Sequence, residues 1–315
     1  MTGVQTCALP ISVPWTVPLA LLGIAWMLLP RGFPARWLGA MLALPLFTVL
    51  PPAPAAGELW ITVLDVGQGL AVLARTQKHA LLYDAGPAFG AFADSGNRII
   101  LPYLRGEGIA RLDALVVSHD DRDHSGGAAS VLEGMPVAAL WSSLPANHAL
   151  VAARESRPCA AGSGWEWDGI VFELLHPDAE AAPGRANNRS CVLRIAAPGG
   201  RVLLTGDIER AAERELLRRA PRLLAADALL VPHHGSATSS SPEFVRAVAP
   251  RYAVFTVGYR NRFGHPREEV LGRYRDAGST LLRTDTGGAV EIRFAQGASR
   301  IELQRERAHR YWHES

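Results

Sequence analysis

Short apolar runs separated by amphipathic stretches make up most of the chain from Leu59 onward. Short apolar runs predict strands, and stretches with a helical apolar period predict the helices between them. We expect strands within residues 59–66, 69–75, 79–85, 114–119, 139–143, 170–177, 190–197, 201–207, 227–234, 252–258, 280–285 and 288–294. We expect helices over residues 97–108, 125–133, 209–219, 242–249 and 266–277. Strands that alternate with helices in this way predict a layered α/β domain.

Several of these predicted strands end in a polar or ionisable residue directly after the apolar run. The residues at these ends are Asp65, Asp84, His119, Asp207 and His233. In layered α/β folds, ligand sites gather where strand ends open into loops. The sequence therefore predicts one shared site at one edge of the sheets.

Residues 13–50 differ from the rest of the chain because they contain two long apolar runs. The first, VPWTVPLALLGIAWMLLP, approaches the ~20 residues that a bilayer span requires, and the second is shorter. A signal peptide or a buried helical hairpin is the alternative, but a signal peptide has one apolar run with basic residues ahead of it. We therefore expect one or two transmembrane helices within residues 13–50, followed by a linker, PPAPAAGE, at residues 51–58.

Arg31 and Arg36 lie between the two apolar runs, with no acidic residue beside them. The positive-inside tendency places such a loop in the cytoplasm. The chain after Glu58 is therefore expected outside the cytoplasmic membrane. Ahead of the runs, GVQTCALPI back-translates to a common sequencing-library adapter. We expect residues 1–12 to be a read artefact fused to a truncated frame, which re-sequencing across Ser12 would test.

The composition is that of a folded protein, with 48% apolar residues and a formal net charge of +2. This small charge excludes a strong overall field, so an anionic polymer would have to bind at local patches. Lys78 is the only lysine, which reflects either a GC-rich genome or the planar contacts that arginine makes with phosphate. Without Cys7 of the expected artefact, Cys159 and Cys191 remain, either as free thiols or as one disulfide.

The segment HDDRDH gathers side chains that bind cations directly after a predicted buried strand. His119 and Asp121 alternate along an extended loop and point the same way, whereas Asp123 and His124 face a second position close by. The residues SGG follow, and Ser125 can cap a helix there. A solvated polar loop is the alternative, but the place after a buried strand favours a metal site.

Taken with the other strand ends, this segment resembles the signature of the metallo-β-lactamase superfamily, HxHxDH followed by GG. The resemblance covers residues 58–296 and includes LDVGQG, YDAG, NNRSCVL, LLTGD, VPHHGS and FGHP. The combination looks like the C-terminal domain of ComEC-type DNA internalisation (competence) proteins, in which a long membrane domain precedes it. The resemblance implies a four-layer αββα fold preceded by residual transmembrane helices. We expect the fold over residues 59–296 and a C-terminal tail at residues 297–315.

The chain departs from that signature at two positions. Asp121 stands where the family has its middle histidine, and NNRS stands where the superfamily has a further histidine. Carboxylate and amide oxygens are hard ligands, so their use makes the expected site rich in oxygen. We therefore expect two divalent ions, with Mn²⁺ or Mg²⁺ favoured and Zn²⁺ as the alternative.

The resemblance implies ligands for both ions. The expected metal ligands are His119, Asp121, Asp123, His124, Asp207 and His265, with Asp65, Asp84, Asn187 and Ser190 as supporting residues. One ion would be held by His119 and Asp121. Asp123, His124 and His265 would hold the other, and Asp207 would bridge the two.

A two-metal site suits phosphodiester hydrolysis because it lowers the pKa of a bound water and clamps the attacking and leaving oxygens. The expected catalytic residues are Asp123, His233 and His234. Either of the two histidines would contact the phosphate or protonate the leaving oxygen. The expected phosphate-binding residues are Ser236, Arg260 and Arg262.

The resemblance thus implies metal-dependent hydrolysis of DNA, for example of the strand that is not imported during natural transformation. The expected partners are single-stranded DNA, the membrane and other competence proteins. One alternative is hydrolysis of another ester or phosphodiester, because the fold carries many chemistries. The other is a non-catalytic domain that guides DNA to a channel, which the two missing histidines would favour.

Overall fold

The computed structural model describes residues 15–49, 51–152, 154–178 and 185–308. The artefact expected at residues 1–12 therefore lies outside the described residues, as do the first two residues of the expected membrane segment. Nothing in the structure bears on the artefact, which stays a prediction.

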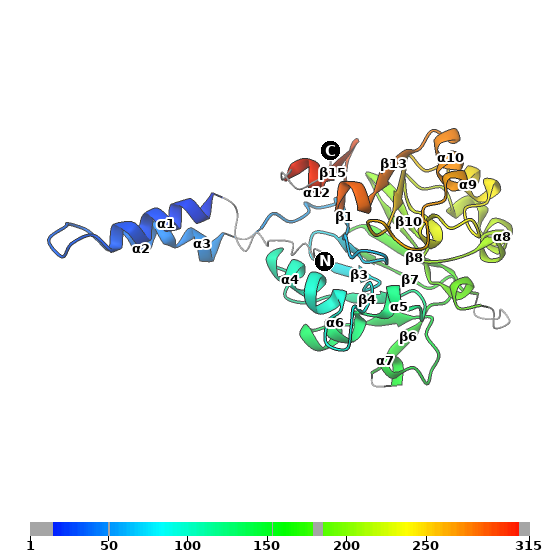
Figure 1. Cartoon of the computed structure of the whole chain (residues 1–315), viewed down its shortest axis with the longest axis horizontal. Helices are drawn as coiled ribbons and strands as arrows, with labels where there is room; N and C mark the ends of the chain where they lie inside the picture. The colour runs from blue at the N-terminus through cyan, green and yellow to red at the C-terminus, as the bar shows by residue number, and fades with distance from the viewer. Residues whose placement is uncertain (1–14, 50, 153, 179–184, 309–315) are drawn as a thin grey trace.

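Two β-sheets pack face to face in the described part of the chain (Figure 1). The first has eight strands in the order β15 (Ala298–Leu303), β14 (Val290–Ala295), β1 (Leu59–Val63), β2 (Val72–Arg75), β3 (Ala80–Tyr83), β4 (Ala114–Val117), β5 (Leu140–Ser142) and β6 (Ser156–Pro158). The second has seven in the order β13 (Thr280–Arg283), β12 (Tyr252–Phe255), β11 (Ala228–Leu230), β10 (Gly200–Leu204), β9 (Val192–Ala197), β8 (Ile170–His176) and β7 (Gly164–Trp167).

Helices cover the outer faces of both sheets. The first sheet is covered by α4 (Leu101–Gly106) and α6 (Ala128–Gly134), and the second by α8 (Arg210–Arg219), α9 (Pro242–Val248) and α10 (Glu268–Asp276). Shorter helical segments are η1 (Gly96–Ile100), α5 (Arg122–Ser125), α7 (Ala149–Ala152), η2 (Asn187–Arg189), η3 (Pro221–Leu223), η4 (Pro232–Gly235), α11 (Thr284–Gly287) and α12 (Gln304–Arg307). The predicted four-layer αββα arrangement is confirmed.

Three apolar cores hold these layers together. Tyr83 and Phe172 are fully buried between the sheets. Leu104 of α4 is buried against the first sheet, and Phe244 of α9 and Tyr274 of α10 are buried against the second. Because each such side chain contributes about 1.5–3 kcal/mol when fully buried, the layers stabilise a fixed frame for the loops at the sheet edges.

Each predicted strand and each predicted helix overlaps an observed one. The strands β6, β7 and β15 were missed. Trp165 and Trp167 of β7 pack against the core between the sheets, and Trp165 stacks on Phe172 with ring centroids 5.5 Å apart. The two tryptophans are therefore packing residues at a sheet edge.

The domain continues past residue 296, where the sequence prediction placed the start of a tail. Strand β15 pairs antiparallel with β14, with Ile301 opposite Ile292 and Arg300 opposite Arg293. The sequence signal is weak there because an edge strand alternates polar and apolar residues and half of its surface faces water. The first part of the predicted tail is thus an edge strand of the first sheet.

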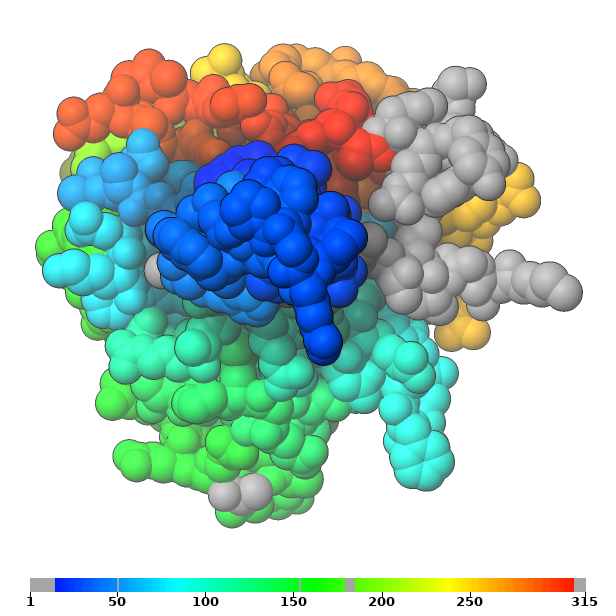
Figure 2. Space-filling model, turned by 90° about the vertical axis from the view of Figure 1, so that its left-hand side faces the viewer, coloured from blue at the N-terminus to red at the C-terminus, as the bar shows by residue number. Residues whose placement is uncertain are grey.

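Residues 15–49 form a separate helical hairpin that projects from the domain (Figures 1 and 2). It consists of α1 (Thr16–Met27), α2 (Leu38–Ala43) and α3 (Pro45–Thr48). Gly23 and Gly39 let α1 and α2 approach closely, because a Cβ on either glycine would collide with the other's carbonyl oxygen. No helix in the described residues is both long and apolar enough to cross a bilayer. The predicted transmembrane helices are therefore not confirmed.

Cys159 and Cys191 form a disulfide, with their Cα atoms 5.7 Å apart. The bond joins the chain after β6 of the first sheet to the start of β9 in the second. Of the two states that the sequence left open, the structure therefore has the disulfide. Such a cross-link stabilises the fold mainly by restricting the unfolded chain.

Candidate metal centre

The predicted strand ends meet at one edge of the sandwich. Strands β3 and β4 are parallel neighbours in the first sheet, and β10, β11 and β12 are parallel neighbours in the second. Their carboxyl ends carry Asp84, His119, Asp207 and His233. Asp65 does not join them, since its carboxylate accepts the Gly67 N–H and pairs with Arg305 at 3.1 Å. Four of the five predicted strand ends therefore lie together at one edge of the sandwich.

Five side chains from these loops bring potential ligand atoms together. They form two overlapping sets, His119, His124 and Asp207, and Asp123, His124 and His234, with the atoms of each set within 4.8 Å of one another. His124 belongs to both sets. Its Nε2 lies 3.1 Å from Asp207 Oδ1 and 3.2 Å from His234 Nε2. We call these five residues the inner cluster.

The second ring nitrogens of His124 and His234 are both fixed by acceptors. His124 Nδ1 lies 2.7 Å from Asp84 Oδ2, and His234 Nδ1 lies 2.7 Å from the Thr256 carbonyl oxygen. Because these oxygens only accept, each Nδ1 carries a proton and each Nε2 is the atom that faces the cluster. Two lone pairs cannot face each other at 3.2 Å unless a proton or a cation lies between them.

His119 adds a third ring nitrogen to the cluster. Its Nδ1 contacts the hydroxyls of Ser118 at 2.9 Å and Ser190 at 3.3 Å, whereas its Nε2 is buried without a hydrogen-bond partner. A buried polar atom without a partner costs about 1–3 kcal/mol. A divalent cation would satisfy this atom and relieve the facing lone pairs, so the residues of the inner cluster fit metal ions.

The cluster's charges shift one another's pKa values. Burial alone would raise the pKa of Asp207, but His124 and His234 outweigh it and hold that pKa well below its usual value. Burial also acts against Asp123, whose pKa nevertheless falls to about 2 because of its hydrogen bond from His234 and the nearby His124 charge. In the opposite sense, burial lowers the pKa of His124, but Asp207 and Asp84 raise it well above its usual value. The carboxylates are therefore ionised and attract a positive charge, which is a proton or a metal ion.

Asp121, an expected ligand, and Ser190, an expected supporting residue, lie beside His119. Asp121 Oδ2 is 3.5 Å from His119 Nε2, and the Asp121 side chain is half exposed. Ser190 is fully buried, and its hydroxyl accepts the Asp207 N–H at 3.1 Å and donates to the Asn187 carbonyl at 2.7 Å. Asn187 thus contributes a backbone oxygen that holds Ser190 in place.

The structure places His234, and not His265, in the inner cluster. His234 Nε2 is 3.3 Å from Asp123 Oδ2, while the His265 ring lies at the rim, 6.0 Å from the His233 ring between centroids. Burial, with the neighbouring His233 and His234, lowers the pKa of His265 to about 4. The sequence prediction had given His234 a catalytic role and His265 a ligand role. In the structure His234 contributes an atom to the cluster and His265 does not, and the role of each residue stays a prediction.

His233 lies between the cluster and the rim, as expected for a residue that meets substrate. Its Nε2 is 3.7 Å from Asp207 Oδ2, and its Nδ1 is 3.2 Å from Thr238 Oγ1. Ser236 Oγ contacts Thr238 Oγ1 at 3.1 Å, so it supports the same loop. This network orients His233 from the side away from the cluster.

The expected phosphate-binding arginines lie on the loop after β12. The guanidinium of Arg260 lies over the Tyr259 ring and that of Arg262 over the Phe263 ring, each 5.0 Å from the ring centroid. Both arginines are near His265 in sequence and outside the inner cluster.

Unusual backbone conformations help to aim these side chains. His233 and His234 have φ values of 50° and 54°, a left-handed region that non-glycine residues rarely adopt. Gly206 precedes Asp207 with a φ of 52°, and a Cβ there would lie 2.9 Å from the Ser190 Cβ. Strained positions of this kind cluster at functional sites.

The sequence interpretation missed two supporting residues, Ser118 and Thr256. The Ser118 hydroxyl lies 2.7 Å from Asp84 Oδ2 and 2.9 Å from His119 Nδ1, and Thr256 holds His234. Each is the residue directly after a strand, Ser118 after β4 and Thr256 after β12. The signal that identified the charged strand ends would therefore have found them if hydroxyl residues had been included.

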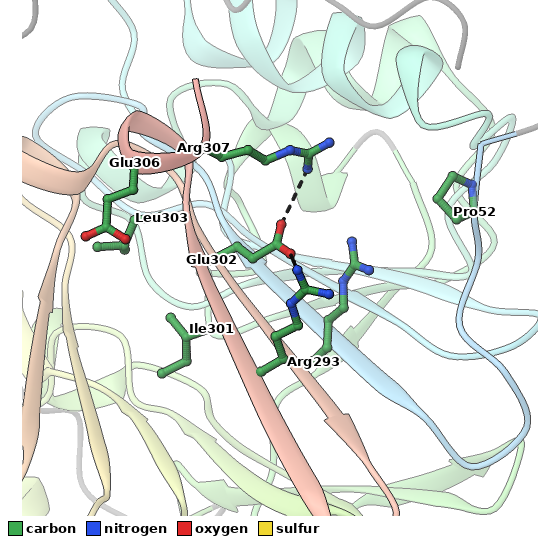
Figure 3. A pocket seen from close by; sticks show the side chains of 8 residues that line it. Pro52, Arg293, Ile301, Glu302, Leu303, Glu306 and Arg307 are labelled. Carbon is green, nitrogen blue, oxygen red and sulfur yellow. Dashed lines mark ion pairs between the residues drawn. The ribbon is translucent and has the colours of Figure 1, made fainter. Parts of the chain in front are cut away.

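A surface cavity lies elsewhere, against β14 and β15 where the linker passes (Figure 3). It is lined by Pro52 and several charged residues. Glu302 in this cavity pairs with Arg300 at 2.7 Å and Arg307 at 3.5 Å. None of its lining residues belongs to the candidate site, and arginines outnumber glutamates among them, so we do not assign the metal centre there.

Residues 64–258 match the sequence profile described as the metallo-beta-lactamase superfamily. The chain belongs to the metallo-beta-lactamase superfamily. It is also similar to competence protein ComA of Neisseria gonorrhoeae, with 39% identity over 98% of this chain and 42% of ComA. Recombination protein 2 of Haemophilus influenzae is 35% identical over 83% of this chain and 32% of its own length. The resemblance to a competence-protein domain is thereby confirmed.

The chain spans less than half of the length of these curated relatives. Among solved structures, a mutant of the beta-hydroxylase CmlA of Streptomyces venezuelae is similar over 90% of this chain and 62% of its own, with 14% identity and a TM-score of 0.50. This likeness supports the fold alone, because proteins of one fold carry different activities.

Proposed function

We propose that this domain is a metal-dependent phosphodiesterase that hydrolyses DNA. The observation that carries the proposal is the inner cluster, in which His124 Nε2 lies 3.1 Å from Asp207 Oδ1 and 3.2 Å from His234 Nε2. Its residues fit divalent ions, and the superfamily match supports a metal-dependent hydrolase. The relatives named for competence and recombination support DNA as the substrate.

Bound ions would supply Lewis acidity and an activated water at this site. The residues of the chain hold and orient the reactants around them. Asp123 and Asp207, both ionised, would anchor the ions, and Asp84 keeps His124 in the tautomer that presents Nε2 inward. His233 Nε2, 3.7 Å from Asp207 Oδ2, is available to contact the phosphate or donate a proton to the leaving oxygen.

The donor set refines the expected choice of metal. The sequence favoured Mn²⁺ or Mg²⁺ because histidines are missing from the signature, yet His234 adds an imidazole to His119 and His124. Imidazole suits zinc and other transition metals, whereas Mg²⁺ prefers oxygen ligands. Mixed nitrogen and oxygen donors favour Mn²⁺ over Mg²⁺ here, with Zn²⁺ as the alternative.

The setting of the domain is part of the proposal. Apolar side chains such as Trp37 (65% exposed) and Phe47 (80% exposed) line the helical hairpin. We propose that this hairpin sits in the bacterial inner membrane, with the domain on the extracytoplasmic side where the disulfide is chemically permitted. The domain would act on single-stranded DNA during uptake, beside other competence proteins.

The test uses the full chain in mild detergent, loaded with Mn²⁺, Mg²⁺ or Zn²⁺ in turn. Cleavage of labelled single- and double-stranded DNA and bound metal are both measured. We expect Mn²⁺-dependent cleavage that falls about a hundred- to thousandfold in Asp207→Ala and Asp123→Ala, because each removes a charge from the site. Asp276→Asn, at the exposed end of α10, is the matched control and should retain full activity.

Binding of DNA without cleavage under every metal would contradict the proposal. That result would favour the non-catalytic reading, in which the domain only guides DNA. Cleavage of a small diester substrate without cleavage of DNA would instead favour hydrolysis of another ester.

A further inference from the structure

Exposed aromatic side chains of the domain concentrate on two loops beside the inner cluster. Among the described residues after the hairpin, the exposed large apolar side chains are Phe89, Phe92, Val171, Tyr259 and Phe263. Four of these five are aromatic, with exposures of 50% for Phe89, 93% for Phe92, 56% for Tyr259 and 46% for Phe263. Exposed apolar groups that lie close together mark an interaction site, and each of the two loops carries two such rings within a stretch of five residues.

The loop at residues 258–265 leads from the surface to the inner cluster through a row of rings. Phe263 stacks on His265 with centroids 6.0 Å apart and planes 10° apart. His265 meets His233 edge-on at 6.0 Å, and His233 Nε2 is 3.7 Å from Asp207 Oδ2. An aromatic group stacked on Phe263 would therefore lie close to the reacting centre.

The loop at residues 86–95 is attached to the segment that carries His124. The Ala85 N–H donates to the His124 carbonyl at 2.8 Å, and the Gly127 N–H donates to the Gly86 carbonyl at 3.2 Å. The tip turns back on itself, since the N–H groups of Phe89 and Gly90 both donate to the Ala93 carbonyl. The backbone that carries Phe89 and Phe92 is thus fixed to the backbone of a cluster residue.

The charge around these rings favours a polyanion over an apolar protein surface. The loop at residues 258–265 reads GYRNRFGH and contains no acidic residue. Arg260 and Arg262 lie over the rings of Tyr259 and Phe263, which holds positive charge beside each aromatic face. In the second loop, the Asp94 carboxylate is occupied by the Ser130 hydroxyl at 2.6 Å and the Asn97 N–H at 2.8 Å.

We propose that the two loops bind single-stranded nucleic acid by stacking unpaired bases on Phe89, Phe92, Tyr259 and Phe263. Arg260 and Arg262 contact the sugar-phosphate backbone beside them. Stacking on aromatic faces tolerates any base, but it requires faces that a duplex hides. The strand's position over the inner cluster rests on the proposed function, whereas base stacking can be measured without cleavage.

The test measures fluorescence anisotropy of the full chain with EDTA, using three labelled probes of equal length. These are oligothymidylate, an abasic oligomer with the same backbone, and a duplex. The variants are Phe92→Ala and Phe263→Ala, and Phe47→Ala on the exposed hairpin is the matched control. Phe92 is 93% exposed, so its replacement leaves packing intact even where Phe263→Ala disturbs His265.

We expect oligothymidylate to bind more tightly than the abasic oligomer and the duplex. Phe92→Ala and Phe263→Ala should each weaken oligothymidylate binding about five- to hundredfold and leave abasic binding unchanged. Phe47→Ala should change neither. If all three probes bind alike, or if the two loop variants bind oligothymidylate as wild type does, the inference is wrong.

Two further outcomes separate this inference from the proposed function. Base-dependent binding without cleavage in Mn²⁺ supports the stacking surface and contradicts the nuclease. Cleavage in Mn²⁺ with no base-dependent binding does the reverse. If Phe92→Ala changes the oligomeric state of the protein without DNA but leaves DNA binding unchanged, the loop serves self-association and the inference is wrong.

Discussion

The inner cluster and its rim use the same residue type in opposite electrostatic settings. His124 and His234 are buried, with each Nδ1 fixed by an oxygen acceptor, and nearby carboxylates raise their pKa values against the effect of burial. His265 stands at the rim, its Nδ1 has no hydrogen-bond partner, and burial with neighbouring imidazoles lowers its pKa to about 4. The two inner rings thus have their orientation fixed by an acceptor at Nδ1, and no such hydrogen bond fixes the ring at the rim.

We infer from this difference that a histidine's role as a metal ligand depends on which group binds its Nδ1, the ring nitrogen that faces away from the ion. A fixed Nδ1–H defines the tautomer and the direction of the lone pair. Asp84 supplies that fixation for His124, and the Thr256 carbonyl supplies it for His234. If this fixation separates ligands from rim residues, replacing the two kinds of histidine should change metal affinity to different degrees.

The largest expected effect on metal affinity is the difference between replacing His234 and replacing His265. We expect His234→Ala to lower metal affinity by more than about a hundredfold. Loss of a residue that only supports a ligand costs about ten- to a hundredfold in metal affinity, and loss of the ligand itself should cost more. His265→Ala should change metal affinity by less than about threefold, because in this account His265 neither binds the ion nor orients a residue that does. Isothermal titration with Mn²⁺ measures both. A loss of the ion in His265→Ala with retention in His234→Ala would restore the ligand set expected from sequence.

A smaller effect should follow from Asp84→Asn, which keeps the shape but removes the charge behind His124. We expect metal affinity to fall about ten- to a hundredfold. Asp65→Asn is the matched control, because Asp65 is also a strand-end aspartate but pairs with Arg305 outside the cluster. If the two variants lose affinity equally, orientation of His124 is not the cause.

The smallest expected effect is a gain in affinity for Zn²⁺. Asp121→His restores the histidine of the superfamily signature at a half-exposed position 3.5 Å from His119 Nε2. Because imidazole suits zinc better than carboxylate does, we expect Zn²⁺ affinity to rise roughly tenfold relative to Mn²⁺. Competition between the two metals, followed by metal analysis after dialysis, measures the ratio. An unchanged ratio would mean that residue 121 does not face an ion.

Much of the fold could be predicted because its core strands are continuous apolar runs. The runs that end at Asp84, His119 and Asp207 are buried strands whose loops meet at one edge. The edge strands β7 and β15 were harder to predict, because GWEW and ASRIEL alternate polar and apolar residues and resemble loops. Edge position, which depends on the whole sheet, has no local signal.

The site could be predicted as a region but not in its full arrangement. His233 and His234 are adjacent in the chain, and sequence cannot tell which ring turns inward. Their left-handed backbone and the Thr256 carbonyl, which lies 22 residues further on, decide it. His265 was chosen as a ligand because FGHP matches a motif, whereas its ring is held at the rim by stacking on Phe263.

The most direct test of the central claim is anomalous diffraction from crystals of the full chain soaked in Mn²⁺. The account predicts anomalous density between His124 Nε2, Asp207 and His234 Nε2, with any second peak beside His119 Nε2. It also predicts that Asp207→Ala crystals lose the density. Density next to His265, or none within the inner cluster at saturating Mn²⁺, would contradict the account.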